Sequence, residues 1–150
     1  MKKLLKFIFF VCIGTITIRF IKNIIKLSTY RKVTVFGNIE TPLATKELTD
    51  KSYALLFGSM NLDLRAATIA GNEMTIKIYS RFSGINIKLP QDWNISIEGR
   101  EKDSGIYTKV NYDETNTTSP QLKIVYDIKF SGMKITSFDT ITESTETDSN

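Results

Sequence analysis

The side chains that could do chemistry in this chain of 150 residues are mainly carboxylates. Asp113 and Glu114 are adjacent, and Glu98, Glu101 and Asp103 lie within one short polar stretch. A general acid–base pair needs two carboxyl groups whose environments push their pKa values apart, whereas stretches rich in Asn, Thr and Ser are typical of solvated loops. These carboxylates therefore indicate surface charge and not a catalytic pair.

The residue types that are missing narrow the chemistry further. The chain has no histidine, which is the commonest general base and transition-metal ligand. Its single cysteine, Cys12, lies in the apolar N-terminal run, so the rest of the chain has no thiol nucleophile, Cys/His zinc site or disulfide framework. No glycines show the phosphate-binding spacing ahead of a helix. We expect a protein that is not an enzyme, with no catalytic residue, no cofactor and no metal.

Charge is distributed unevenly along the chain. Eight of the twenty basic residues fall within residues 1–32, and the first acidic residue is Glu40, so the remainder carries twelve basic residues against all sixteen acidic ones. A basic arm that flanks apolar residues is typical of contact with anionic lipid headgroups, whereas nucleic-acid binding favours a basic patch on a folded domain. The sequence therefore predicts anionic membrane lipids as partners and no nucleic acid.

The N-terminal apolar segment predicts attachment to the cell membrane. Residues 4–21 would extend about 27 Å as a helix, slightly short of a hydrocarbon core of about 30 Å, and the residues after them have amphipathic helical spacing. No small-x-small cleavage site follows. Two interpretations stay open: a single-pass anchor that continues into an interfacial helix, or an uncleaved helix that lies on the surface. The predicted membrane-interface residues are Lys6, Arg19, Lys22 and Lys26.

The positive charges that flank this segment give a weak indication of sidedness. Three basic side chains precede the uncharged run of residues 7–18 and five follow it, within residues 1–32. Lys and Arg resist translocation, so the side with more of them tends to stay in the cytoplasm. This bias predicts that the domain after the anchor is cytoplasmic.

From Lys32 onward the pattern changes to two-residue alternation, which is typical of half-buried strands. Apolar and polar residues alternate in five segments: 60–64, 74–78, 85–89, 93–97 and 122–130. The composition divides the chain into three parts, which are a membrane anchor with its juxtamembrane helix (1–32), a β-domain (33–138) and a disordered acidic tail (139–150).

A repeated motif, aromatic-small-small-apolar, indicates the architecture of the β-domain. The small residue before each apolar position recurs at intervals of 21, 25, 21 and 27 residues. Such spacing predicts a short β-solenoid with single-stranded, β-helix-like coils, in which a small residue forms each tight corner and the preceding Phe stacks on its counterparts in the core. A β-sandwich, with the motif at strand bends, is the alternative. The predicted corner residues are Phe36, Gly37, Phe57, Gly58, Phe82, Gly84, Gly105, Phe130 and Gly132.

Asp63 and Arg65 are the outward-facing charges that we consider for a partner surface. Two residues apart on a predicted strand, they share a face and can pair with each other or with a neighbouring coil. A surface ion pair of this kind stabilises the fold by less than about 1 kcal/mol. Two interpretations stay open: the pair is an ordinary solvated surface pair, or it docks a partner.

Three blocks of the β-domain resemble a known family. They are Leu55-Leu56-Phe57-Gly58-Ser59-Met60-Asn61-Leu62-Asp63-Leu64-Arg65-Ala66-Ala67, then Arg81-Phe82-Ser83-Gly84-Ile85-Asn86-Ile87-Lys88-Leu89-Pro90 followed by Trp93, and finally Phe130-Ser131-Gly132-Met133-Lys134-Ile135. In this order they are similar to the C-terminal domain of LiaF-like proteins, the cell-wall-active antibiotics response family. The resemblance covers about residues 33–136.

The resemblance implies a bacterial regulator that sits at the membrane and restrains a sensor histidine kinase of the cell-envelope stress response. Family members usually carry several transmembrane helices before this domain, whereas this chain has one short apolar segment. A second functional interpretation comes from the fold. Open strand edges of a solenoid template further pairing, so the chain could self-associate into a membrane-attached β-solenoid scaffold.

Overall fold

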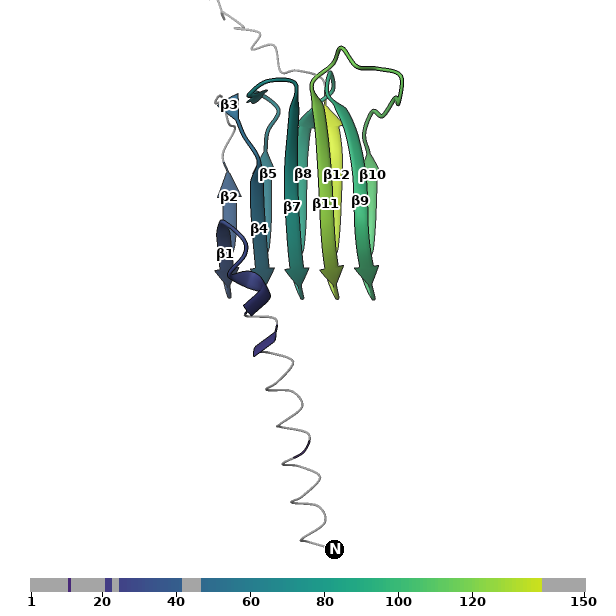
Figure 1. Cartoon of the computed structure of the whole chain (residues 1–150). Coiled ribbons are helices and arrows are strands. Elements are labelled where there is room, and N and C mark those ends of the chain that lie inside the picture. The colour runs from purple at the N-terminus through teal and green to yellow at the C-terminus, as the bar shows by residue number, and fades with distance from the viewer. Residues whose placement is uncertain (1–10, 12–20, 23–24, 42–46, 139–150) are drawn as a thin grey trace, which may run out of the picture.

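All strand pairs that the structure describes are parallel, and most of these strands form two sheets that lie face to face (Figure 1). The computed structural model describes residues 11, 21–22, 25–41 and 47–138. Its strands are β1 Lys32–Val35, β2 Asn38–Thr41, β3 Glu47–Leu48, β4 Lys51–Leu56, β5 Ser59–Asp63, β6 Thr68–Ile69, β7 Glu73–Arg81, β8 Gly84–Pro90, β9 Asn94–Lys102, β10 Gly105–Lys109, β11 Gln121–Lys129 and β12 Gly132–Phe138.

Each coil consists of one strand in each sheet, joined by a two-residue arc. The first sheet, sheet A, has the order β1-β4-β7-β11-β9, and the second, sheet B, has the order β10-β12-β8-β5-β2. Because the pairs β1/β2, β4/β5, β7/β8, β11/β12 and β9/β10 stack in the same order in both sheets, the domain is the all-β solenoid that the repeat predicts. A small sheet of β3 and β6 lies at the end opposite the arcs (Figure 1).

The coils do not follow one another in space as they do in the chain. The coil β11/β12, last in sequence, lies between β7/β8 and β9/β10. The chain reaches this place through a loop over residues 110–120, which the buried side chain of Asn94 organises. The Asn94 amide nitrogen donates to the carbonyl oxygens of Asp113 and Asn116 and to the side-chain oxygen of Gln121, and its oxygen accepts the Asp113 backbone N–H.

The core fills the space between the two sheets with aliphatic side chains from the inward-facing rows. Strand register aligns these rows: Met60, Ile85, Met133 and Ile106 lie side by side on neighbouring strands of sheet B. Trp93 is buried in the same core, just before β9. The largest side chains that are fully buried are Tyr79, Ile39, Leu55, Met60, Leu62, Ile76, Ile78, Ile87, Leu89, Ile95, Leu122 and Ile124.

The repeated phenylalanines lie in the arcs, outside the core. The sequence analysis predicts them inside the core, and this part of the prediction is wrong. Phe36, Phe57, Phe82 and Phe130 adopt φ values of 52° to 56°, and Asp103 takes the equivalent place in the remaining coil with φ 51°. A left-handed conformation costs a bulky residue roughly 1–2 kcal/mol, because its Cβ approaches the next carbonyl oxygen. The left-handed residue is therefore the one before the small residue of each arc. The four rings are stacked, with centroids 4.9 to 5.1 Å apart.

The small residue after each left-handed position has a different reason to be small. At Gly58, an added Cβ would lie 2.1 Å from the Gly37 carbonyl oxygen, so the backbones of these two coils approach too closely for any side chain. In the other coils, Ser83, Ser131 and Ser104 occupy this position. Each hydroxyl donates to the carbonyl oxygen two residues earlier, at 2.9 to 3.0 Å, and accepts the N–H of the equivalent residue in the neighbouring coil, at 3.2 to 3.3 Å.

The N-terminal helical residues 25–27 dock on the outer face of sheet A, close to the arcs (Figure 1). Leu27 is buried there with Ala54, Leu56 and Tyr79. Asp127 accepts hydrogen bonds from Lys26 and, at 2.8 Å, from Arg81. Burial raises the pKa of the Asp127 carboxyl, but the two basic groups outweigh this effect and hold the pKa below its ordinary value.

The predicted membrane anchor and acidic tail fall mainly outside the described residues, so the division into 1–32, 33–138 and 139–150 stays a prediction. The β-strands begin at Lys32 and end at Phe138. Where the structure describes helical residues, they form no helix long and apolar enough to cross a bilayer.

We predict that Gly58→Ala lowers the free energy of unfolding by about 3 kcal/mol or more, because its Cβ meets the Gly37 backbone. Gly84→Ala is the matched control, since a Cβ there meets nothing within 4 Å, and we expect no loss of stability and a gain of at most about 1 kcal/mol. Urea denaturation of the full chain, followed by fluorescence of the buried Trp93, measures both. Equal losses in the two variants would contradict the close approach of these coils.

We predict that Asp127→Asn lowers the free energy of unfolding at neutral pH, because it removes the ion pairs with Lys26 and Arg81. The expected loss is only about 1 kcal/mol, because both pairs are partly exposed. A carboxyl with a lowered folded-state pKa stabilises the fold above its unfolded pKa of about 4, and this contribution is lost as pH falls through the folded-state value. The difference between variant and wild type should therefore shrink below about pH 4. Glu98→Gln, which breaks a more exposed pair with Lys123, is the control and should have little effect at any pH.

Candidate partner-binding surface

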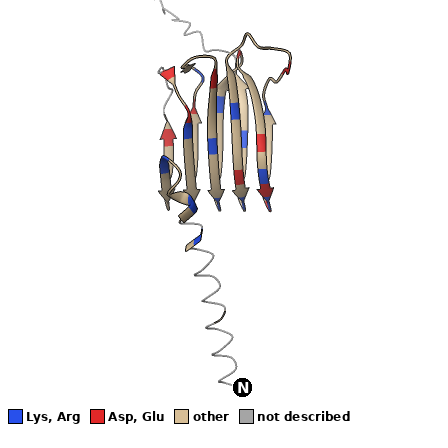
Figure 2. Ribbon diagram, viewed as in Figure 1, with Lys and Arg blue, Asp and Glu red and all other residues tan. Residues whose placement is uncertain are grey.

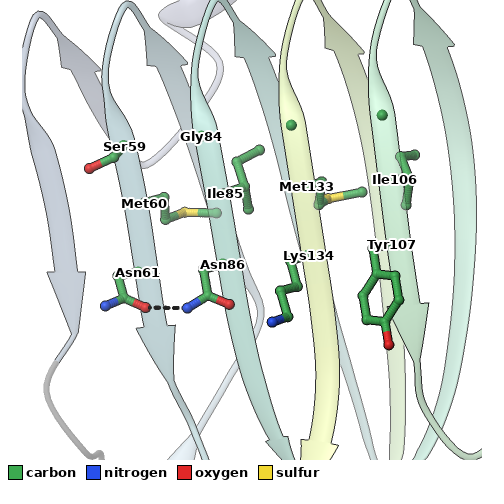
Figure 3. A pocket seen from close by; sticks show the side chains of 12 residues that line it. Ser59, Met60, Asn61, Gly84, Ile85, Asn86, Ile106, Tyr107, Met133 and Lys134 are labelled. Atoms are coloured by element: carbon green, nitrogen blue, oxygen red, sulfur yellow. Dashed lines mark hydrogen bonds between the residues drawn. The ribbon is translucent and has the colours of Figure 1, made fainter.

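A shallow groove of about 650 Å³ crosses the outer face of sheet B near the arcs (Figure 3). Its floor is formed by the first residues of four neighbouring strands, which strand register aligns in one row: Ser59, Gly84, Gly132 and Gly105. These residues leave the strand backbone accessible because three of the four have no side chain. The groove is therefore open along the stacking direction of the coils.

A second row, two residues further along each strand, borders the groove with polar side chains. It contains Asn61, Asn86, Lys134 and Tyr107, again aligned by strand register (Figure 3). The Asn86 amide nitrogen donates to the Asn61 side-chain oxygen at 3.0 Å. The Lys134 ammonium lies 5.8 Å from the centre of the Tyr107 ring, within the range of a cation–π contact. The row thus presents amide groups at one end and an aromatic ring with a positive charge at the other.

The glycines on the floor are not required by local packing. A Cβ added at Gly84, Gly105 or Gly132 would meet nothing within 4 Å, and none of the three has a positive φ. Glycine in a strand costs stability relative to Ala, roughly 0.5–1 kcal/mol, because it loses more conformational freedom on folding. The absence of a steric reason for glycine at these positions favours a role in keeping the groove open.

A second depression of about 490 Å³ continues from the groove toward the other end of the strands. The two share Tyr107 and Lys134, so they form one continuous hollow surface. Thr136 lines the second depression with a buried hydroxyl that has no hydrogen-bond partner.

The charged residues that the sequence suggested for partner binding lie outside the groove. Strand β5 ends at Asp63, so Arg65 lies in the following turn and not on the strand. Arg65 binds Asp63 with two hydrogen bonds of 2.7 and 2.8 Å, and this pairing holds the pKa of the Asp63 carboxyl below its ordinary range. The Arg65 guanidinium also lies 5.7 Å from the Phe138 ring. A role for this pair in partner binding stays a prediction.

The structure describes two of the four predicted membrane-interface residues. Lys6 and Arg19 lie outside the described residues. Lys22 is exposed on the helix, and Lys26 binds Asp127 while it lies 4.8 Å from the centre of the Tyr79 ring. Lys26 thus serves to dock the helix on sheet A, and its contact with lipid stays a prediction.

The predicted corner residues all lie at or beside the arcs. Phe36 and Gly37, Phe57 and Gly58, and the single residues Phe82 and Phe130 occupy the arcs themselves. Gly84, Gly105 and Gly132 are the first residues of β8, β10 and β12, so they form the groove floor and not the corners. Sequence analysis missed the row Asn61, Asn86, Lys134 and Tyr107, although each of these residues follows the start of its strand by two positions in an alignment of the repeats.

The described residues of the groove provide hydrogen-bonding groups and an accessible backbone, and they include no cluster of catalytic side chains. Among the described residues, no three His, Cys, Asp or Glu side chains lie close enough to hold a metal ion. Asp113, part of a carboxylate pair in the sequence, accepts hydrogen bonds from Thr115 that lower the pKa of its carboxyl, and it lies in the 110–120 loop. The arrangement is suited to binding another molecule.

Comparison with known proteins identifies the domain. Residues 35–129 match the family model described as "Cell wall-active antibiotics response LiaF, C-terminal". The match runs from the last residue of β1 to the last residue of β11, so the third resembling block, which starts at Phe130, lies beyond it. The comparisons with curated proteins and with solved structures each found no match.

Proposed function

The chain belongs to the family of LiaF C-terminal domains of the cell wall-active antibiotics response, and we propose that it is a membrane-anchored regulator that binds a sensor histidine kinase. Family membership implies a role in the cell-wall antibiotic stress response. The further steps, which are membrane anchoring by residues 4–21, a cytoplasmic β-domain and modulation of a kinase, are our proposal.

The observation that carries the binding role is the open groove of sheet B. Three glycines that packing does not require leave its floor accessible, and Asn86, Lys134 and Tyr107 supply polar and aromatic contacts beside it. Grooves that combine accessible backbone, amide groups and a tyrosine are suited to a peptide segment of another protein. The regulator therefore acts by docking and carries out no reaction itself.

Self-assembly into a scaffold is the second candidate function. It would require the outermost strands of one domain to pair with those of another. Among the described strands, β9 and β10 lie at one end of their sheets, each with one edge that has no neighbouring strand. The exposed half of β9 carries Glu98, Arg100, Glu101 and Lys102, and charged side chains on an edge strand oppose edge-to-edge pairing. This charge favours a discrete complex over a polymer of stacked domains.

We predict that Gly132→Phe weakens binding of the kinase by about tenfold or more, because the new ring occupies the groove floor. Lys123→Phe is the matched control: it adds the same ring to the exposed outer face of sheet A and should leave affinity unchanged. Full-length chain and candidate stress-response kinases in vesicles give both the affinity and the rate of kinase autophosphorylation. Unchanged affinity of the Gly132 variant, with the wild-type fold retained, would exclude the groove as the binding surface.

We predict that added protease cleaves a tag at the C-terminus in inverted membrane vesicles and does not reach it in intact cells. This result follows if the five positive charges after residue 18 keep the β-domain in the cytoplasm. Cleavage in intact cells would place the domain on the outer side and would contradict a direct contact with the signalling portion of a kinase.

A further inference from the structure

We propose that the domain rests on an anionic lipid bilayer through the edge formed by its arcs. We call this surface the phenylalanine edge, and it consists of Phe36, Phe57, Phe82 and Phe130 with the adjacent Lys102 and Lys129. The inference rests on the membrane-anchoring part of the proposed function and goes beyond it, because it assigns a lipid-binding surface to the folded domain itself.

The four phenylalanine rings form a continuous apolar strip on the outside of the molecule. Their exposed fractions are 73%, 41%, 50% and 44% for Phe36, Phe57, Phe82 and Phe130. Ring stacking covers only the faces that the rings turn toward each other. The remaining ring surface faces solvent, and a contiguous exposed strip of large apolar side chains indicates an interaction site.

The local backbone offers no reason for phenylalanine at these positions. All four have a positive φ, a conformation for which Gly, Asn and Asp are the favoured residues. The coil β9/β10 has Asp103 at the equivalent place, with the same backbone, so the fold does not need an aromatic residue there. Phenylalanine is both strained and exposed at four of five equivalent positions, which points to a binding role.

Three strands beside these rings have a basic residue as their last residue. Strand register aligns Arg81, Lys129 and Lys102 as the last residues of β7, β11 and β9. Figure 2 shows the blue of Lys and Arg at this end of the sheets. Arg81 is occupied with Asp127, whereas Lys102 is exposed and Lys129 lies 4.7 Å from the centre of the Phe130 ring. The acidic residues beside this row are Asp127, which pairs with Arg81 and Lys26, and Glu101 and Asp103, which flank Lys102 in the outermost coil.

The N-terminal segment leaves the domain on this same side. Helical residues 25–27 lie at the arc end of sheet A, and residues 21–22 lie further from the domain in the same direction (Figure 1). Ile21 and Ile25 are exposed, and Lys22 lies beside them. The chain that leads toward the predicted anchor therefore departs from the edge that carries the aromatic strip.

These features together fit the interfacial zone of a bilayer. Exposed aromatic rings bury their apolar surface at the level of the headgroups, and nearby Lys side chains attract anionic phosphates. Membrane contact of this type fixes the orientation of the domain: the strands stand with their arcs on the bilayer, and the 110–120 loop points away from it.

The test places a fluorescent label at each end of the domain in the full chain, with Cys12→Ser to remove the native thiol. Phe57→Cys carries the label on the phenylalanine edge, and Glu114→Cys carries it in the exposed loop at the opposite end. The environment-sensitive probe nitrobenzoxadiazole is used with vesicles of equal parts phosphatidylglycerol and phosphatidylcholine, with and without a headgroup-level lipid quencher. A flotation assay on the same samples reports whether the chain is attached.

We expect strong lipid quenching and a blue shift at position 57 and neither at position 114. Replacement of Lys102 and Lys129 by Glu should reduce the quenching at position 57 by more than half, while flotation persists. Weak quenching at both positions in a chain that still floats would overturn the lipid contact and leave the anchor intact. A chain that fails to float would overturn both, and a blue shift at position 57 without quenching would indicate contact between copies and overturn the proposal.

Discussion

The structure depends on one constraint, which is that the parallel hydrogen-bond ladder continues through the arcs. The backbone N–H of Phe57 donates to the Arg81 carbonyl oxygen, and the N–H of Ser59 donates to Gly37, so neighbouring coils stay in register where the chain turns. Coils that pair in this way must have the same backbone at the same place. This requirement explains why five non-glycine residues have φ values between 51° and 56°, and why the residue that follows each is Gly or Ser.

Register also determines what the surface of such a molecule can do. Equivalent positions of successive coils become rows, so a residue type that recurs in the repeat is displayed as a strip. The rows of aliphatic side chains that include Met60 form the core, the row from Asn61 to Tyr107 borders a groove, and the phenylalanines form an edge. Strips suit extended partners such as a peptide or a membrane surface, whereas catalysis needs several different groups converging on one point.

The sequence predicted the parts of the fold that repeat and missed those that depend on pairing between distant segments. Two-residue alternation and intervals of 21 to 27 residues identified the strands and the solenoid. Chain order, however, does not reveal that β11 pairs with both β7 and β9, because this choice depends on how three long strands fit together. The phenylalanines lie at the corners and stack across the coils as the repeat predicts, but their burial in the core was predicted incorrectly, because the positive φ at these positions is visible only in the backbone. The groove was missed because its floor consists of residues without side chains.

The groove and the phenylalanine edge adjoin each other, which joins the two proposed contacts physically. Gly84 follows Phe82 by two residues, so the groove floor begins within about 7 Å of chain from the edge. A domain that stands on the bilayer by this edge holds the groove beside the membrane surface, at the height where the juxtamembrane segment of a membrane kinase leaves the bilayer. Docking of the helix through Lys26 and Leu27 would limit rotation of the domain about the proposed anchor. Lipid contact would then reduce the orientational freedom lost when a membrane partner binds, and affinity for the partner would depend on the anionic lipid content of the membrane.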